Sequence, residues 1–183
     1  MRPEDPAALL LRAIAFAASR HRMQRRKDRA KTPYINHPIE VASLVANTGG
    51  VRDLDVLAAA VLHDTVEDTK TNPRELEKLL GKKVRRLVEA LSDDKSLHRA
   101  TRKWLQIEHA PHLPRVAKLI KLADLTSNLT GLAESPPAAW PLKRRRKYAE
   151  WAAAVAAGCR GVNPGLEAAF DKALRRARRV LAN

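Results

Sequence analysis

Four side chains that can bind a metal ion or transfer a proton lie within six consecutive residues. They are His63, Asp64, Glu67 and Asp68, in a segment otherwise built from Ala, Val and Leu. In a continuous helix the carboxylates at positions 67 and 68 lie one turn beyond His63 and Asp64, so all four can project to one side. Acidic pairs in an apolar segment repel each other, and a divalent cation compensates for this cost. The pattern predicts a metal site, and an exposed acidic helix end is the alternative.

Two residues elsewhere in the sequence can complete this site. His37 precedes Pro38, which is favoured in the first turn of a helix, and Asp124 lies in the apolar helical segment KLIKLAD. Each is weak evidence by itself, because a lone His is usually a core or surface residue and a lone Asp on a helix is usually solvated. With His63 and Asp64 they form a set of two imidazoles and two carboxylates. This set suits Mn²⁺, Fe²⁺ or Zn²⁺, with positions left for water or substrate.

The elements that must position these residues are helices. Ala and Leu dominate, apolar residues recur at spacings of three and four, and no strand pattern stands out. Helices are predicted to begin at His37-Pro38, at Asp53 or Asp55, and at Asn72-Pro73 with Glu75, and the first and last of these to end at Gly49-Gly50 and Gly81. Further helices are predicted over 9–17, 83–91, 99–110, 115–132, 138–157 and 163–181. We therefore expect an all-α, single-domain bundle of about eight to ten helices over residues 1–183.

Composition narrows the class of ligand. The 183 residues include 35 Lys and Arg against 20 Asp and Glu, a formal net charge of +15, which attracts polyanions. Three Trp, two Tyr and two Phe leave few platforms on which bases could stack, so a phosphorylated small molecule is favoured over nucleic acid. The single cysteine, Cys159, gives no reason to expect an oxidising compartment, so we expect a cytoplasmic protein. The apolar stretch 7–18 contains Arg12 and is too short to span a membrane.

Several longer strings resemble the hydrolase domain of RelA/SpoT proteins, within the HD superfamily of metal-dependent phosphohydrolases. The strings are RKD at 26–28, TPYINHP at 32–38, LHDTVEDT at 62–69, DDK at 93–95 and KLAD at 121–124. The order His, His-Asp, Asp is the HD-superfamily pattern. The similarity runs from the first helix to YAEW at 148–151 and leaves nothing over for a synthetase or regulatory domain. We therefore expect one HD hydrolase domain, similar to the small alarmone hydrolases of the metazoan SpoT homologue type.

The resemblance implies a reaction and a division of roles. The implied ligands of one Mn²⁺ ion per chain are His37, His63, Asp64 and Asp124. The acidic pair Glu67 and Asp68 is implied to position and deprotonate the attacking water. The implied reaction removes pyrophosphate from the 3′ position of guanosine tetra- or pentaphosphate and gives GDP or GTP, which is alarmone turnover in the stringent response. The physical logic is that a metal polarises a phosphoryl oxygen while carboxylates orient the nucleophile.

The same resemblance implies a set of substrate contacts. Arg26 and Lys27 are expected near the guanine base, Asn128 near the ribose and phosphates, and Arg144 and Tyr148 at the phosphate end. For the three cations the alternative is plain surface charge. The sequence departs from the family after Asp124, where a Lys and an aromatic residue are common and this chain has Leu125 and Ser127. If the family Lys contacts phosphate, this chain binds the alarmone less tightly or prefers another nucleotide, and if that Lys only lies on the helix surface, nothing follows.

Two other functions are compatible with these residues. The first is the same machinery acting as a phosphatase on another nucleotide, such as the 2′-phosphate of NADPH. The second is a non-catalytic module that binds nucleotides or nucleic acid through its basic surface. That module predicts binding that weakens steeply with salt and no turnover of nucleotides, and it fits poorly with the presence of both Glu67 and Asp68.

Overall fold

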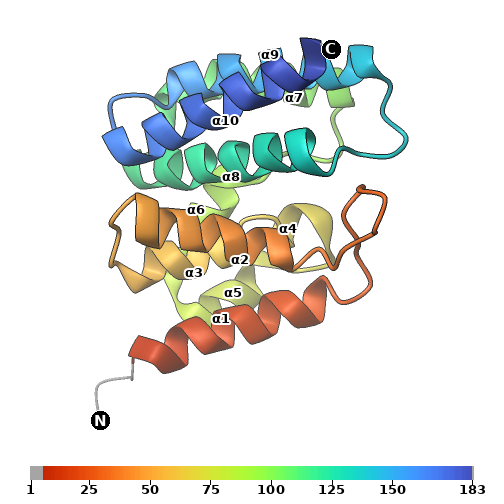
Figure 1. The fold of residues 1–183 in the computed structure, drawn as a ribbon. Coiled ribbons are helices and arrows are strands. Elements are labelled where there is room, and N and C mark those ends of the chain that lie inside the picture. The colour runs from red at the N-terminus through yellow and green to blue at the C-terminus, as the bar shows by residue number, and fades with distance from the viewer. Residues whose placement is uncertain (1–5, 183) are drawn as a thin grey trace.

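The computed structural model describes residues 6–182, and they form an all-helical fold, as predicted (Figure 1). In chain order the helices are α1 (Pro6–Arg20), α2 (Asn36–Ser43), α3 (Leu54–Leu62), α4 (Thr65–Asp68), α5 (Pro73–Leu80), α6 (Lys82–Leu91), α7 (Arg99–His109), α8 (Arg115–Glu134), α9 (Leu142–Gly158) and α10 (Pro164–Ala182). A π-helical turn, η1 (Leu44–Thr48), continues α2, and a 3-10 turn, η2 (Ala110–His112), follows α7. Within residues 6–182 the β-structure consists of one isolated bridge between Arg25 and Pro33. None of the helices described is long and apolar enough to span a membrane.

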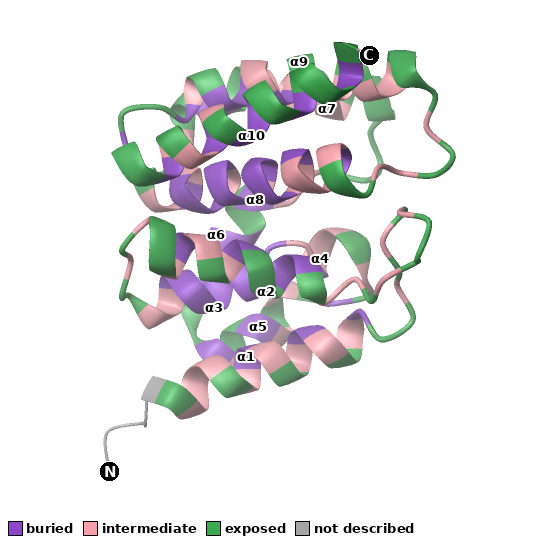
Figure 2. Ribbon diagram, in the orientation of Figure 1, coloured by how far each residue is buried: buried purple, intermediate pink, exposed green. Residues whose placement is uncertain are grey.

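Two helices form the centre of the molecule. Helix α3 is buried from Val56 to Leu62 without interruption, and α8 packs against α2, α6, α9 and α10. Figure 1 shows α8 between the half of the molecule that contains α1, α2, α3 and α5 and the layer formed by α9 and α10. Figure 2 shows buried residues along α3 and most of α8. Because apolar contacts fix these helices, side chains that project from them are held in place.

Local sequence signals position the helix ends much as predicted. The Asn72 side chain accepts a hydrogen bond from the Arg74 amide, and Glu75 accepts one from the Asn72 amide, which completes a capping box. Asp53 caps α3 by accepting from the Asp55 amide. Helix α9 begins at Leu142, four residues later than the predicted start at 138. Pro141 explains the delay, because a proline disfavours helical backbone at the residue before it.

The helix through residues 63–68 is broken, and here the prediction of one continuous helix was wrong. Helix α3 ends at Leu62, and a separate turn of helix, α4, begins at Thr65. The hydroxyl of Thr65 donates to the Leu62 carbonyl at 2.7 Å, and Nδ1 of His63 lies 2.8 Å from the Ala60 carbonyl. These side chains occupy carbonyls that the next helical turn would otherwise use, so they end α3 and redirect the acidic residues that follow.

Candidate metal centre and substrate cavity

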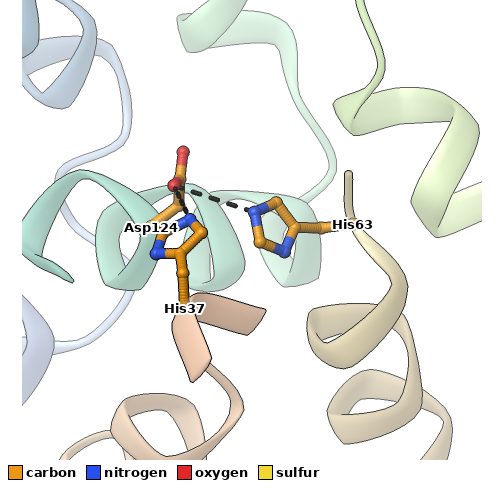
Figure 3. A group of neighbouring side chains, drawn as sticks. All are labelled: His37, His63 and Asp124. Carbon is orange, nitrogen blue, oxygen red and sulfur yellow. Dashed lines mark ion pairs between the residues drawn. The ribbon is translucent and has the colours of Figure 1, made fainter. Parts of the chain in front are cut away.

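Three residues from separate elements converge at the centre of the fold. His37 lies in the first turn of α2, His63 directly follows α3, and Asp124 lies in the middle of α8 (Figure 3). One donor atom from each lies within 4.8 Å of the other two. Oδ1 of Asp124 is 3.1 Å from Nε2 of His37 and 3.7 Å from Nε2 of His63, and both imidazoles are buried. The structure thus assembles a nitrogen and oxygen donor set from residues up to 87 positions apart.

Asp64, the fourth predicted ligand, lies beside this group. Its Oδ2 atom is 3.0 Å from Nε2 of His63 and 3.8 Å from Nε2 of His37. It falls outside the compact group of three, whose donor atoms all lie within 4.8 Å of one another. The Tyr34 hydroxyl donates to the same Oδ2 atom at 2.6 Å. Asp64 is therefore shared between the two histidines and a tyrosine.

The chemistry of these donors fits a divalent cation. Nδ1 of His63 faces the Ala60 carbonyl, which can only accept, so this nitrogen carries the proton and Nε2 points toward the carboxylates. Nε2 of His63 is buried and makes no hydrogen bond within the described part of the chain. A buried nitrogen left without a hydrogen bond beside two carboxylates is the arrangement that a metal ion completes.

The pKa shifts of these groups also fit a site for a divalent cation. Burial would raise the pKa of Asp124, but its contacts with His37 and His63 hold it well below the ordinary value. Burial would also raise the pKa of Asp64, but the charge and hydrogen bond of His63 outweigh burial, so the pKa of Asp64 is lowered. Burial lowers the pKa of His63, yet Asp64 and Asp124 together raise it well above the usual value. Both carboxylates are therefore ready ligands, and a metal ion competes with a proton on His63.

Glu67 and Asp68, the predicted catalytic pair, lie on α4 and have different surroundings. Oε2 of Glu67 accepts from the Asp93 amide at 3.1 Å, and its Oε1 is 3.4 Å from the Arg102 guanidinium. Asp68 accepts a hydrogen bond from Gln24 and lines a cavity. This cavity adjoins the group of His37, His63 and Asp124, here called the metal group, because its lining residue Asn128 bonds to Asp124. Nζ of Lys95 contacts both, at 3.2 Å from Glu67 and 2.7 Å from Asp68. Burial raises the pKa of Glu67 above its ordinary value.

The cavity that Asp68 lines is bordered by four of the five predicted substrate contacts. It measures about 260 Å³, and the four residues are Arg26, Lys27, Asn128 and Tyr148. The Arg26 guanidinium donates to the side-chain oxygen of Asn128 at 3.1 Å, and the Asn128 amide donates to Asp124 at 2.6 Å. A direct hydrogen-bonded chain therefore joins the wall of the cavity to the metal group.

Arg144, the fifth predicted contact, lines a second cavity of about 550 Å³. The two cavities share Trp140 and Tyr148, and the guanidinium carbon of Arg144 lies 4.3 Å from the Trp140 ring centre. Four of the residues that line it are positively charged, Arg99, Lys103, Arg144 and Lys147, and no described carboxylate lines it. Burial and the nearby charges of Arg99 and Arg144 lower the pKa of Lys103 to about 8. This cavity is suited to several negative charges on one ligand.

Several residues that build the site were not among the predicted ones. Tyr34, Lys95 and Arg102 contact the acidic residues, and Ser127 lies 2.9 Å from Nδ1 of His37. Tyr34 and Lys95 stand within the TPYINHP and DDK strings, which was the available signal for them. Leu125, which replaces the Lys common in the family, is fully buried in the core, so it lies neither on the helix surface nor in the lining of either cavity.

Comparison with known proteins agrees with this geometry. A family model described as HD domain matches residues 13–155, which is most of the chain and contains every predicted site residue. The chain belongs to the HD-domain family. This HD domain is 53% identical, over 164 residues, to the guanosine-3′,5′-bis(diphosphate) 3′-pyrophosphohydrolase MESH1 of Homo sapiens. It is 51% identical over 165 residues to the MESH1 protein of Xenopus tropicalis, and each alignment covers 90% of this chain and 92% of the relative.

A solved structure is similar to this HD domain over its whole fold. It superposes with a TM-score of 0.92 on a structure described as a metazoan ortholog of SpoT that hydrolyzes ppGpp, at 43% identity. That match covers 98% of this chain and 99% of the other. The sequence alignments with the two MESH1 proteins and the structural match each cover nine-tenths or more of both chains.

Proposed function

We propose that this HD domain is a metal-dependent guanosine-3′,5′-bis(diphosphate) 3′-pyrophosphohydrolase that converts the tetra- or pentaphosphate to GDP or GTP and pyrophosphate. The observation that carries the proposal is the chain of hydrogen bonds from Arg26 through Asn128 to Asp124. It joins a basic cavity of about 260 Å³ to the buried group of His and Asp side chains. MESH1 relatives named for this activity align with 90% of the chain, which supports the same assignment.

The proposed cofactor is one Mn²⁺ ion per chain, with Fe²⁺ or Zn²⁺ as alternatives. It would be held by Nε2 of both histidines and by the two carboxylates, which the proposed ligands His37, His63, Asp64 and Asp124 supply. A divalent ion at this place supplies Lewis-acid polarisation of the phosphoryl group. The mixed imidazole and carboxylate set suits these ions better than Mg²⁺ or Ca²⁺, which prefer oxygen ligands alone.

Glu67 is the proposed general base. Burial raises its pKa, which makes it a better proton acceptor near neutral pH than a solvated glutamate. It takes a proton from water as the water attacks phosphorus, and the bond between the ribose 3′ oxygen and the diphosphate breaks. The 3′ oxygen leaves as a hydroxyl with a proton supplied by solvent, which balances the proton that Glu67 takes from the water, so the products are the nucleotide and pyrophosphate. Nζ of Lys95 contacts both Glu67 and Asp68 and so links the two carboxylates.

The two cavities are proposed to bind different parts of the substrate. Arg26, Lys27 and Asn128 line the smaller cavity, where the nucleoside is proposed to bind. The larger cavity carries the positive side chains and receives phosphate groups that do not react. Tyr148 and Trp140 form the wall between them and offer a flat surface. The proposed ligand is thus a small nucleotide with phosphates at two ends, in agreement with the charge of the chain.

A substrate comparison tests the proposed function. Metal-free protein is incubated with guanosine tetraphosphate or with NADPH, with added Mn²⁺ or with chelator, and the released phosphate species are measured. We expect pyrophosphate and GDP from the tetraphosphate only when Mn²⁺ is present. Orthophosphate from NADPH alone would overturn the substrate assignment, and no turnover of either would overturn the activity.

Variants in the same assay test the site. His63→Ala and Asp64→Ala each remove a ligand, so both are expected to lose turnover and metal retention together. Glu150→Ala is the control, because Glu150 pairs with Arg178 on the exposed face of α9 and should leave both unchanged. Retained Mn²⁺-dependent activity in both ligand variants would contradict the assignment.

We further propose that the protein works in the cytoplasm, in keeping with its single, buried cysteine, Cys159.

A further inference from the structure

We propose that Ser127 and Glu40 are positioning residues that hold His37 in the tautomer able to bind a metal ion. The proposal rests on the proposed metal site and adds two residues that do not touch the ion. It concerns Nδ1 of His37, the ring nitrogen that is not the one beside Asp124.

The contacts form a continuous line from the buried histidine to the surface. Nδ1 of His37 lies 2.9 Å from Oγ of Ser127, and the same Oγ donates to Oε2 of Glu40 at 2.8 Å. His37 and Ser127 are both buried, with 3% and 2% of their surface exposed, whereas Glu40 is exposed. His37 and Glu40 lie on α2 and Ser127 lies on α8, so the line also ties these helices together.

The direction of these hydrogen bonds follows from the number of protons. A serine hydroxyl has one proton, and an ionised carboxylate can only accept, so the Ser127 proton goes to Glu40. The Ser127 oxygen is then left as an acceptor, and Nδ1 of His37 must be the nitrogen that carries a proton. In a neutral imidazole this leaves the lone pair on Nε2, which is the atom 3.1 Å from Asp124.

The two histidines of the site are therefore oriented by different means. Nδ1 of His63 faces the Ala60 carbonyl, a backbone acceptor that no side-chain substitution removes. His37 depends instead on a hydroxyl that could act as donor or acceptor, and Glu40 determines which. Without Glu40 the Ser127 proton is free to turn toward Nδ1 and favour the opposite tautomer, in which a proton on Nε2 competes with the metal. Groups that orient a metal-binding histidine in this way contribute to affinity although they do not touch the ion.

The test is the affinity of the metal-free protein for Mn²⁺, measured by titration calorimetry or by the electron paramagnetic resonance signal of free Mn²⁺. Ser127→Ala removes the acceptor and is expected to weaken binding roughly 10- to 100-fold. Glu40→Ala keeps the hydroxyl but frees its proton, so a smaller loss is expected. Glu40→Gln still offers an oxygen acceptor and should bind as the unchanged protein does. Thr126→Val is the matched control, because it removes a buried hydroxyl of α8 that donates to the Leu122 carbonyl and takes no part in the contacts of His37.

A second readout separates orientation from a general loss of structure. Nitrogen-15 spectra of the metal-free protein report whether Nδ1 of His37 carries a proton, independently of the Nε2 atom that faces Asp124. We expect a proton on Nδ1 in the unchanged protein and in Glu40→Gln, and a partial loss of this proton in Glu40→Ala. Unchanged Mn²⁺ affinity and an unchanged tautomer in Ser127→Ala and Glu40→Ala would overturn the proposal.

A ligand variant keeps this proposal separate from the metal site on which it rests. Asp124→Ala is titrated with Mn²⁺ in parallel. Normal binding by Asp124→Ala would mean that the proposed metal site itself is wrong. Lost binding by Asp124→Ala, with normal binding by Ser127→Ala and Glu40→Ala, would leave the metal site in place and refute only the role of Ser127 and Glu40.

Discussion

The hydroxyl of Tyr34 donates a 2.6 Å hydrogen bond to Oδ2 of Asp64, the same atom that approaches both histidines of the site. Burial and the charge of Asp64 raise the pKa of Tyr34 well above its ordinary value, so the hydroxyl remains a donor across the working pH range. The Tyr34 ring also packs edge-on against His37 and at a tilt against His21. Tyr34 therefore fixes the carboxylate of Asp64 without being a ligand.

We expect Tyr34→Phe to keep the fold and to lose the hydrogen bond that orients the Asp64 carboxylate. The ring contacts are retained, but Asp64 can rotate, so the affinity for Mn²⁺ should fall by roughly 10- to 100-fold. Titration of the metal-free variant measures the loss, and circular dichroism checks the helical content. An affinity equal to that of the unchanged protein would show that Asp64 is held without the tyrosine.

Glu67→Gln is expected to separate metal binding from catalysis. Removing the proposed general base should reduce kcat by about 100- to 10,000-fold, while Mn²⁺ affinity stays the same. Asp94→Asn, an exposed carboxylate that pairs with Ser96 in the loop after α6, is the matched control and should keep full activity. Loss of Mn²⁺ binding in Glu67→Gln would instead make Glu67 part of the metal centre.

The pH dependence of the same enzyme tests the role of Glu67 by a different route. A base acts only when it is ionised, and burial raises the pKa of Glu67 above its usual value of about 4.3. Activity should therefore decline on the acid side at a higher pH than a solvated glutamate would give. This acid limb of kcat/KM should be absent from the residual activity of Glu67→Gln. A limb that persists in the variant would belong to another group.

The residues of the site could be predicted where the informative residues are neighbours in the sequence. His63 and Asp64 stand side by side, and Pro38 marks the helix start that carries His37, so the types and the spacing were informative. The all-helical fold followed from the spacing of apolar residues, because α3 and α8 need an apolar side toward the core. Caps such as Asn72 indicated helix starts to within a residue.

Contacts between distant residues could not be predicted in the same way. Ser127 meets His37 across 90 positions of the chain, and Tyr34 meets Asp64 across 30. The break at His63 depends on side chains that compete with the helix for its carbonyls, which helical periodicity does not express. Glu67 and Asp68 share Lys95 but otherwise have different neighbours, although helix spacing placed them on one side.

Leu125→Ala should affect stability and leave substrate binding unchanged. Leu125 is fully buried on α8, so shortening it leaves a cavity and should cost about 2 to 5 kcal/mol in the free energy of unfolding. Leu129→Ala, on the same helix and equally buried, provides the matched control. Urea unfolding gives the stability, and KM for guanosine tetraphosphate gives the binding. A raised KM without any loss of stability would show that position 125 acts on the substrate.

Lys103 gives the second cavity a dependence on pH. Nζ of Lys103 lies 3.4 Å from the ring centre of Trp151 and 5.0 Å from that of Tyr148, and its pKa is lowered to about 8. Below this pH the ammonium is charged and attracts phosphate, and above it the charge is lost. A bound anion stabilises the protonated form, so substrate binds it more tightly. KM for guanosine tetraphosphate should be nearly constant below about pH 8 and rise above it.

Two variants assign this rise to one side chain. Lys103→Arg keeps a positive charge throughout, because a guanidinium does not lose its proton in this range, so KM should no longer rise between pH 8 and 9.5. Lys103→Gln has no charge at any pH, so KM should already be high at pH 7 and should stay flat. Rises above pH 8 that are equal in the unchanged protein and in Lys103→Gln would mean that another group titrates. Flat profiles in all three proteins would mean that the substrate phosphates do not reach the second cavity.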